Sequence, residues 1–164
     1  MSDPLEWLPG LIRLSDSGGD WNHYLDRLYE AFCEDFVRSK PTYPPKRFAL
    51  KRHPMARGKE ATFWHLIQEG AIEEEREPDL RRCERIRWPR RIIEAVQTDQ
   101  VKVWRNVRGR NDRIVISVND FSYVVILDDR DDYVLLWTAY TVEADHRRRK
   151  LEAEYNSWTA STGK

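Results

Sequence analysis

Residues 101–140 are VKVWRNVRGRNDRIVISVNDFSYVVILDDRDDYVLLWTAY, and this stretch decides the fold class. β-branched and aromatic residues recur in it with a period of two, which is typical of strands that bury one face. Short polar segments divide it into four candidate strands, at residues 101–107, 113–118, 121–127 and 133–140. Because loops this short join neighbouring strands, we expect a four-stranded antiparallel β-meander.

The rest of the chain has the pattern of helices. Apolar residues recur at steps of three and four from Trp21 to Phe36, and Asp20 is a natural N-cap for this helix. We expect further helices from about Lys59 to Glu69, after Pro89, and over residues 143–155. The sequence therefore predicts an α+β fold in which N-terminal helices pack on the antiparallel meander and a helix closes the chain.

No long Gly/Ser or Pro tract divides the 164 residues, so we expect a single domain. Its parts are an N-terminal helical segment over residues 1–48, a core over residues 49–156 and a frayed tail over residues 157–164. The short stretch from Arg47 to Lys51 could add an edge strand.

Composition limits the class of protein. Hydrophobic residues make up 40% of the sequence and charged residues 34%, which is too apolar for a disordered chain and too charged for a membrane protein. No apolar stretch approaches the roughly 18 residues that span a bilayer, and the N-terminus lacks the pattern of a secretory signal. We therefore expect a soluble cytoplasmic protein with no membrane contact.

Several catalytic classes lack their sequence motifs here. The P-loop, dinucleotide-binding, HExxH and GxSxG patterns are absent, which argues against nucleotide hydrolysis and zinc proteolysis. Cys33 and Cys83 lack the spacing of a zinc site, and no two of the four histidines stand at helical ligand spacing. The sequence therefore predicts no metal and no cofactor.

Positive charge is concentrated in the middle of the chain. Net charge is zero, but residues 81–113 hold eleven basic side chains against four acidic ones. Arginine binds phosphate with two parallel hydrogen bonds, and a nearby tryptophan can stack on a base. These arginines could form an anion-binding face or pair with the acidic run at residues 73–79. Many of these arginines lie in residues 80–88, where the spacing of the apolar residues does not distinguish a helix from a strand.

Two groups of side chains could carry acid–base chemistry. His65 lies in a predicted helix and can exchange a proton near neutral pH, although a structural histidine that bridges core groups is an alternative. His53, before Pro54, is a weaker candidate. Thr138 and Tyr140 end the last predicted strand, where alternation puts them on one face with Leu136; they could contact a phosphate or be ordinary strand residues.

Four segments together resemble the phage-associated ribonuclease domains of the BECR fold, the barnase, EndoU, colicin and RelE-like group. They are GKEATFWHL at residues 58–66, PDLRRCERIRWPRRIIEA at 78–95, YVVILDDRDDYVLLWTAY at 123–140 and HRRRKLEAEY at 146–155. The resemblance covers about residues 51–155, within the expected core. It implies a metal-independent endoribonuclease, of the toxin or phage-derived effector type. In that reaction the 2′-hydroxyl attacks the adjacent phosphate and leaves a 2′,3′-cyclic phosphate.

The resemblance also implies roles for individual residues. His65 would be the general acid or base, Arg85 would hold the scissile phosphate, and Thr138 with Tyr140 would orient it or relay a second proton. RNA would be bound by the remaining basic and aromatic residues of these segments, namely Lys59, Arg81, Arg82, Arg87 and Trp88. The second proton carrier stays open among His53, His146, Tyr140, Glu60 and Glu84.

Two other functions remain open beside the enzyme. The arginine-rich face could belong to a non-catalytic nucleic-acid-binding module, in which binding falls steeply with salt. Alternatively, the abundant Trp and Tyr could form a protein-interaction surface. The expected partners are RNA and, if the chain is a toxin, an inhibitor or antitoxin protein.

Overall fold

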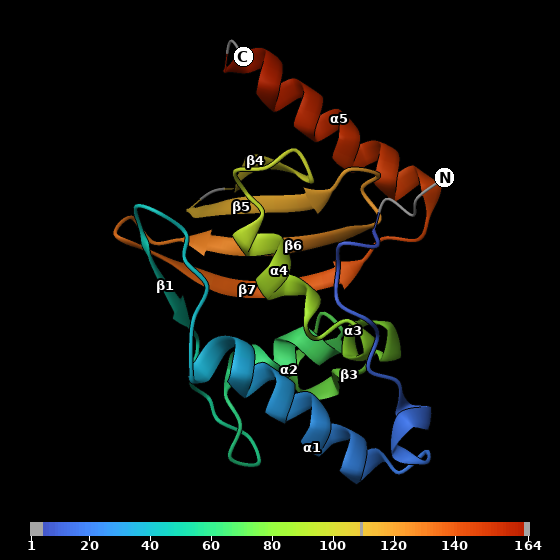
Figure 1. Ribbon diagram of the computed structural model, residues 1–164. Helices are drawn as coiled ribbons and strands as arrows, with labels where there is room; N and C mark the ends of the chain where they lie inside the picture. The colour runs from blue at the N-terminus through green and yellow to red at the C-terminus, as the bar shows by residue number, and fades with distance from the viewer. Residues whose placement is uncertain (1–4, 109, 163–164) are drawn as a thin grey trace.

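A five-stranded mixed sheet is the main element of the computed structural model, which describes residues 5–108 and 110–162 (Figure 1). The strand order is β1-β7-β6-β5-β4. The strands are β1 Arg47–Leu50, β4 Val101–Arg108, β5 Asn111–Val118, β6 Tyr123–Asp129 and β7 Tyr133–Thr141.

The four strands of the predicted meander are confirmed, but the prediction of a purely antiparallel four-stranded sheet is wrong. β4 to β7 pair antiparallel in chain order, whereas β1 adds to the edge of β7 in the parallel direction. Only strands joined by short loops must run antiparallel. A long helical segment separates β1 from β4, so no short turn fixes the direction of β1.

The helices are short except at the two ends of the chain. They are α1 Trp21–Phe32, which continues as the π-helical η2 Cys33–Val37, then α2 Ala61–Ile67, α3 Leu80–Glu84, α4 Trp88–Glu94 and α5 Asp145–Ser161. Smaller elements are η1 Leu14–Ser17, η3 Glu73–Glu75 and the strand pair β2 Gln68–Glu69 and β3 Glu77–Pro78. The ambiguous residues 80–88 thus form α3, a turn at residues 85–87 and the first residue of α4.

Side-chain caps fix two of these helix starts. The carboxylate of Asp20 accepts hydrogen bonds from the backbone of Asn22 and His23, which confirms the N-cap predicted for α1. Asp79 accepts one from the backbone of Arg81 in the same way at α3. Each cap satisfies backbone donors that the first helical turn leaves without a partner.

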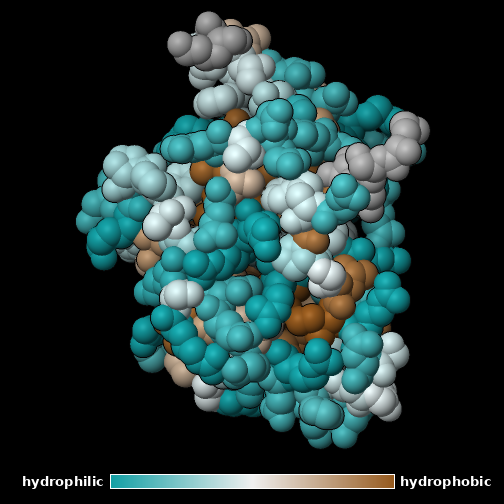
Figure 2. All heavy atoms as spheres, in the orientation of Figure 1, coloured by the Kyte–Doolittle hydropathy of each residue, from teal (hydrophilic) through white to brown (hydrophobic). Residues whose placement is uncertain are grey.

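One side of the sheet, here called the main face, holds the larger core. Helices α1 to α4 contribute apolar side chains to this core, and most of these are almost completely buried. From the sheet, the core receives Ile114, Ile116, Val118, Tyr123, Val125, Leu127, Val134, Leu136 and Ala139. The surface seen from the helix side is mainly hydrophilic, with hydrophobic residues gathered in patches (Figure 2).

The opposite side, here called the α5 face, holds a smaller core. Trp104, Val115 and Val124 pack there against Leu151, Tyr155 and Trp158 of α5. The contact of Trp158 lies beyond the predicted end of the helix, which continues to Ser161 rather than losing definition at Ser157. The predicted tail also includes residues 163 and 164, which lie outside the described residues.

Among the described residues, no helix has both the length and the apolar character needed to cross a membrane.

Candidate functional site

A β-bulge sets the direction of the side chains in the second half of β7. The pairing of β6 with β7 shifts by one residue at Trp137. A bulge of this kind redirects nearby side chains. Leu136 packs in the main core, whereas Trp137, Thr138 and Tyr140 line a hollow on the α5 face. The expectation that Leu136 shares a face with Thr138 and Tyr140 is therefore wrong.

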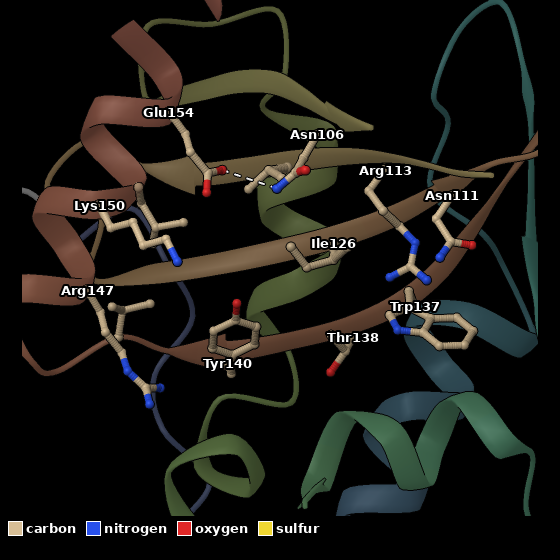
Figure 3. Close-up of a pocket in the computed structure, with 13 residues that line it drawn as sticks. Asn106, Asn111, Arg113, Ile126, Trp137, Thr138, Tyr140, Arg147, Lys150 and Glu154 are labelled. Atoms are coloured by element: carbon tan, nitrogen blue, oxygen red, sulfur yellow. Dashed lines mark hydrogen bonds between the residues drawn. The ribbon is translucent and has the colours of Figure 1, made fainter. Parts of the chain in front are cut away.

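This hollow, here called the sheet hollow, lies between the open part of the sheet and α5 and has a volume of about 530 Å³ (Figure 3). Val115, Ile126 and Val142 give it an apolar base. Polar and aromatic groups surround that base, from Asn106, Asn111, Arg113, Trp137, Thr138, Tyr140, Arg147, Lys150 and Glu154. A flat apolar group with charged substituents would find complementary surfaces there.

Two cations flank the indole of Trp137. The guanidinium carbon of Arg113 lies 4.6 Å from the ring centroid, and the ammonium of Lys51 lies 5.6 Å from it. Nε of Arg113 is also 3.4 Å from a carboxylate oxygen of Asp128. Cation–π contacts hold the aromatic ring and place positive charge beside a stacking surface.

Helix α5 supplies positive charge from the other side of the sheet hollow. Arg147 and Lys150 project from the helix toward it (Figure 3), and within the described part of the chain neither forms an ion pair. Glu154, one turn further along, accepts hydrogen bonds from Nδ2 of Asn106 at 3.2 Å and from Nε1 of Trp104 at 3.3 Å. The hollow therefore has cations at both ends and a fixed carboxylate at one side.

His65 lies at the neighbouring His65 hollow, which has a volume of about 450 Å³ and shares Trp137 and Thr138 with the sheet hollow. The half-buried imidazole contacts the Trp137 indole edge-on, with the ring centroids 5.3 Å apart. Lys51, Arg76 and Arg82 line the same hollow. The imidazole is thus placed beside positive charge and an aromatic surface rather than sealed in the core.

Arg82 fixes the end of α2 against β7. Its guanidinium donates to the backbone oxygens of His65 at 3.1 Å and Gln68 at 2.6 Å, and it lies 3.3 Å from Oγ1 of Thr138. Thr138 donates in turn to the His65 oxygen at 3.1 Å, and the guanidinium carbon lies 5.4 Å from the Tyr140 ring. Burial lowers the pKa of Arg82 below its ordinary value, and Asp79 opposes that effect.

The structure therefore brings together four of the residues predicted for the site, His65, Arg82, Thr138 and Tyr140. Arg85 and Arg81 line a third hollow of about 450 Å³, here called the Arg148 hollow, with Arg148, Ser122, Thr141, Val142 and others. There the Arg85 guanidinium lies 5.0 Å from the centroid of Trp88.

The remaining predicted site residues lie elsewhere. Lys59 places its ammonium 5.1 Å from the ring of Tyr29, and His53 is exposed in the loop after β1. Arg87 forms ion pairs with Glu34 at 2.6 Å and Asp35 at 3.4 Å, both of which lie in η2.

Trp88 is buried, and its Nε1 donates to the Pro9 oxygen at 2.8 Å. Arg87 and Trp88 therefore hold the N-terminal segment in place, through partners that lie far away in the sequence.

Sequence reasoning missed several residues of the two hollows. Arg113 and Trp137 stood in predicted strands but meet only because of the bulge and the strand order. Arg147 and Lys150 belong to the basic block of the last helix, whose charge was visible but whose direction was not. Lys51 and Arg76 come from loops around α2, which give no periodic signal.

Neither a metal site nor a known relative assigns a function to these hollows. Among the described residues, no group of three or more His, Cys, Asp or Glu side chains is arranged to hold a metal ion. Comparison with protein-family models, with curated proteins and with solved structures gave no match for this chain. The functional proposal therefore depends on the geometry of the hollows and on the chemistry of their side chains.

Proposed function

We propose that this chain is a metal-independent endoribonuclease that cleaves RNA by attack of the 2′-hydroxyl on the adjacent phosphate. One observation carries the proposal: the half-buried imidazole of His65 lies against the Trp137 indole, and the cations of Arg113 and Lys51 flank that same ring. A proton carrier, a stacking surface and phosphate-binding cations are the groups that this reaction needs.

In the proposed reaction, the 2′-oxygen forms a bond to phosphorus and the bond from phosphorus to the 5′-oxygen breaks. His65 accepts the proton of the 2′-hydroxyl, and the hydroxyl of Tyr140 donates a proton to the leaving 5′-oxygen. Of the open choices for the second proton carrier, Tyr140 is favoured because its side chain lines the sheet hollow. Glu60 instead accepts a hydrogen bond from Tyr29 at 2.8 Å, and His146 is exposed on α5.

Arg113 takes over the phosphate role that the sequence gave to Arg85. Its guanidinium lies beside Trp137 at the junction of the sheet hollow and the His65 hollow, whereas Arg85 lies in the Arg148 hollow. A positive charge fixed beside the reacting phosphate stabilises the charge that develops in the transition state. Arg82 has a different role and positions His65 through its backbone oxygen.

The test uses purified protein and single-stranded RNA in excess EDTA, with analysis of the product ends. We expect 2′,3′-cyclic phosphate and 5′-hydroxyl products, and a loss of rate by at least about 100-fold in the His65→Ala variant. His23→Ala is the matched control, because His23 is exposed on α1, outside the three hollows. Equal loss in both variants, or cleavage that requires added metal, would contradict the proposal.

The second candidate is an RNA-binding module without turnover. It is favoured by the cations that lie away from His65, because Arg81, Arg85 and Arg148 line a hollow that does not include this imidazole. Binding that weakens steeply with salt, without any cyclic-phosphate product, would identify this alternative.

The proposed activity also implies a cellular setting. An RNA-cleaving enzyme would act in the cytoplasm, where RNA is abundant, and the cell that makes it would need an inhibitor protein. We propose that such an antitoxin covers the sheet hollow. Protection of the cationic residues of α5 in the complex would test this.

A further inference from the structure

The second half of β7 lies between two cationic helices. β1 pairs only with residues 133–136 of β7, so the edge of β7 beyond Leu136 is bordered by α2 and α3 instead of a strand. Figure 1 shows α3 on one side of this part of β7 and α5 on the other. In this half of the strand, Trp137, Thr138, Tyr140 and Thr141 are partly exposed, whereas Ala139 is buried.

The three hollows adjoin one another along this half of β7. The His65 hollow and the sheet hollow share Trp137 and Thr138, and the sheet hollow shares Val142 with the Arg148 hollow. We name the continuous surface over residues 137–142 the β7 groove. At about 3.3 Å per residue, it extends for about 17 Å.

Basic side chains occur along the whole length of the β7 groove. Each of the three hollows has three Lys or Arg side chains, nine in all, against the three carboxylates of Asp120, Glu143 and Glu154. Arg81 forms an ion pair with Glu143, which neutralises one charge on each side. Arg82, Arg85 and Arg113 also lie within ion-pair distance of the carboxylates of Asp79, Glu84 and Asp128. Among the described residues, no ion pair is formed by Lys51, Arg147, Arg148 and Lys150, so each hollow keeps at least one of these cations. Such a series of cations suits a regularly spaced polyanion better than a single phosphate.

Aromatic rings interrupt the cations at two points. Trp137 lies at one end of the groove and Tyr140 near its middle, and both line the sheet hollow. Single-stranded nucleic acid binds through backbone phosphates that follow a positive groove and bases that stack on aromatic rings. A duplex keeps its bases stacked on one another and could not use these rings.

We infer that the β7 groove binds an extended single strand of RNA over about four or more nucleotides, from the His65 hollow to the Arg148 hollow. This inference rests on the proposed function for the identity of the ligand as RNA. It adds that the Arg148 hollow, which lies apart from His65, binds the continuation of the strand rather than the reacting phosphate.

Three consecutive arginines of α5 provide a matched test. Arg147 lines the sheet hollow and Arg148 lines the Arg148 hollow, whereas Arg149 is exposed and lines none of the three hollows. Nε of Arg148 donates to the Val142 oxygen at 2.8 Å, and within the described residues its terminal nitrogens have no protein partner. Each Arg→Ala variant removes one charge from the same helix.

The experiment measures binding of 2′-O-methyl RNA by fluorescence anisotropy, because this RNA lacks the attacking hydroxyl and is not cleaved. The probes are about two and about eight nucleotides long, which are shorter and longer than the groove. Arg147→Ala should weaken binding of both probes about tenfold. Arg148→Ala should weaken only the longer probe, by about fivefold, and should lower the slope of log affinity against log salt by about 0.7. Arg149→Ala should change neither.

Two results would overturn the inference: equal effects of Arg148→Ala and Arg149→Ala on the longer probe, or equal affinity of the wild-type protein for both probes. Circular dichroism and thermal unfolding of each variant check that the fold is kept. Because the probe cannot be cleaved, this result is independent of catalysis. Length-dependent binding without RNA cleavage would contradict the ribonuclease proposal alone, and cleavage without length dependence would contradict the β7 groove alone.

Discussion

The main face and the α5 face of the same sheet differ in how completely helices cover them. On the main face, Ile116 and Leu127 are completely buried in the larger core. On the α5 face, Trp104 and Val124 are buried, but Ile126 on the neighbouring part of the sheet is only half-buried and lies at the base of the sheet hollow. A single helix covers only part of that face.

Because of this difference, we expect one face of the sheet to contribute mainly to stability and the other mainly to function. The main face holds the larger cluster of buried residues, so its apolar side chains contribute the larger share of the hydrophobic stabilisation. The open part of the α5 face can hold charged groups such as Arg113, Arg147 and Lys150 because solvent still reaches them. Helix α5 contributes to both stability and function, since it packs against the smaller core and also forms one side of the sheet hollow (Figure 3).

Two tryptophans on the α5 face provide the largest expected contrast. Trp104 is 1% exposed under α5, whereas Trp137 is half-buried at the bulge. Trp104→Ala should reduce the free energy of unfolding by about 3–5 kcal/mol, because it leaves a cavity and removes a donor to Glu154. Trp137→Ala should cost about 1 kcal/mol in stability and instead weaken RNA binding by about 1–3 kcal/mol.

Urea unfolding and anisotropy measure the two quantities on the same variants. Equal losses of stability would show that the sheet hollow is packed as tightly as the core under α5. Unchanged RNA binding in Trp137→Ala would remove the stacking surface from the proposed site.

The next largest effect on stability is expected from a substitution of Asp129, which lies at the edge of the main face. Its side chain is 4% exposed and accepts hydrogen bonds from Lys46 at 2.6 Å and Arg105 at 2.5 Å. Burial opposes ionisation of this carboxyl, but the hydrogen bonds from Arg105 and Lys46 outweigh it and lower the pKa of Asp129 below its ordinary value. The ionised carboxylate is therefore the form that stabilises the fold.

Asp129→Asn should reduce the free energy of unfolding by about 2 kcal/mol at neutral pH, less than for a fully buried pair because both cationic partners are partly exposed. A lowered pKa stabilises the fold above the pKa of the unfolded state, about 3.9, and this contribution is lost as pH falls below it. The difference between wild type and variant should therefore shrink in acid. Asp132→Asn, at an exposed pair with Arg47, is the control and should change stability little. A difference that stays constant with pH would contradict this assignment.

Features that depend on local sequence patterns could be predicted, whereas features that depend on contacts between distant segments could not. The four strands of the meander and the Asp20 cap follow from local patterns, which are alternation, turn residues and capping chemistry. The parallel pairing of β1 does not, because a four-residue strand far away in the chain has no local signal for its direction.

The site was harder to predict for the same reason. The bulge at Trp137 exists only as a mismatch between two strands, so one strand's sequence cannot reveal it. Arg87 and Trp88 had the composition of an RNA-binding segment, but their partners Glu34 and Pro9 lie more than fifty residues earlier in the chain. Composition showed the charge, and only tertiary contacts decided which arginines remained accessible.

The smallest expected effect concerns the two free thiols, which report how tightly the main face is closed. Cys83 is completely buried on α3, and burial, helped by the nearby carboxylates of Asp79 and Glu84, raises its pKa to about 12. Cys33 is half-buried, and burial raises its pKa as well.

Since the thiolate is the reactive form, we expect iodoacetamide at a pH of about 8 to label Cys33 slowly and Cys83 only when the fold opens. Peptide mass spectrometry of the wild type, and of Cys33→Ser with Cys83 as its one thiol, measures the two rates. Labelling of Cys83 should match the rate expected from global unfolding in urea, because α3 packs into the main core. Faster labelling would mean that α3 opens locally, and since α3 also positions Arg82, the His65 hollow would then open with it.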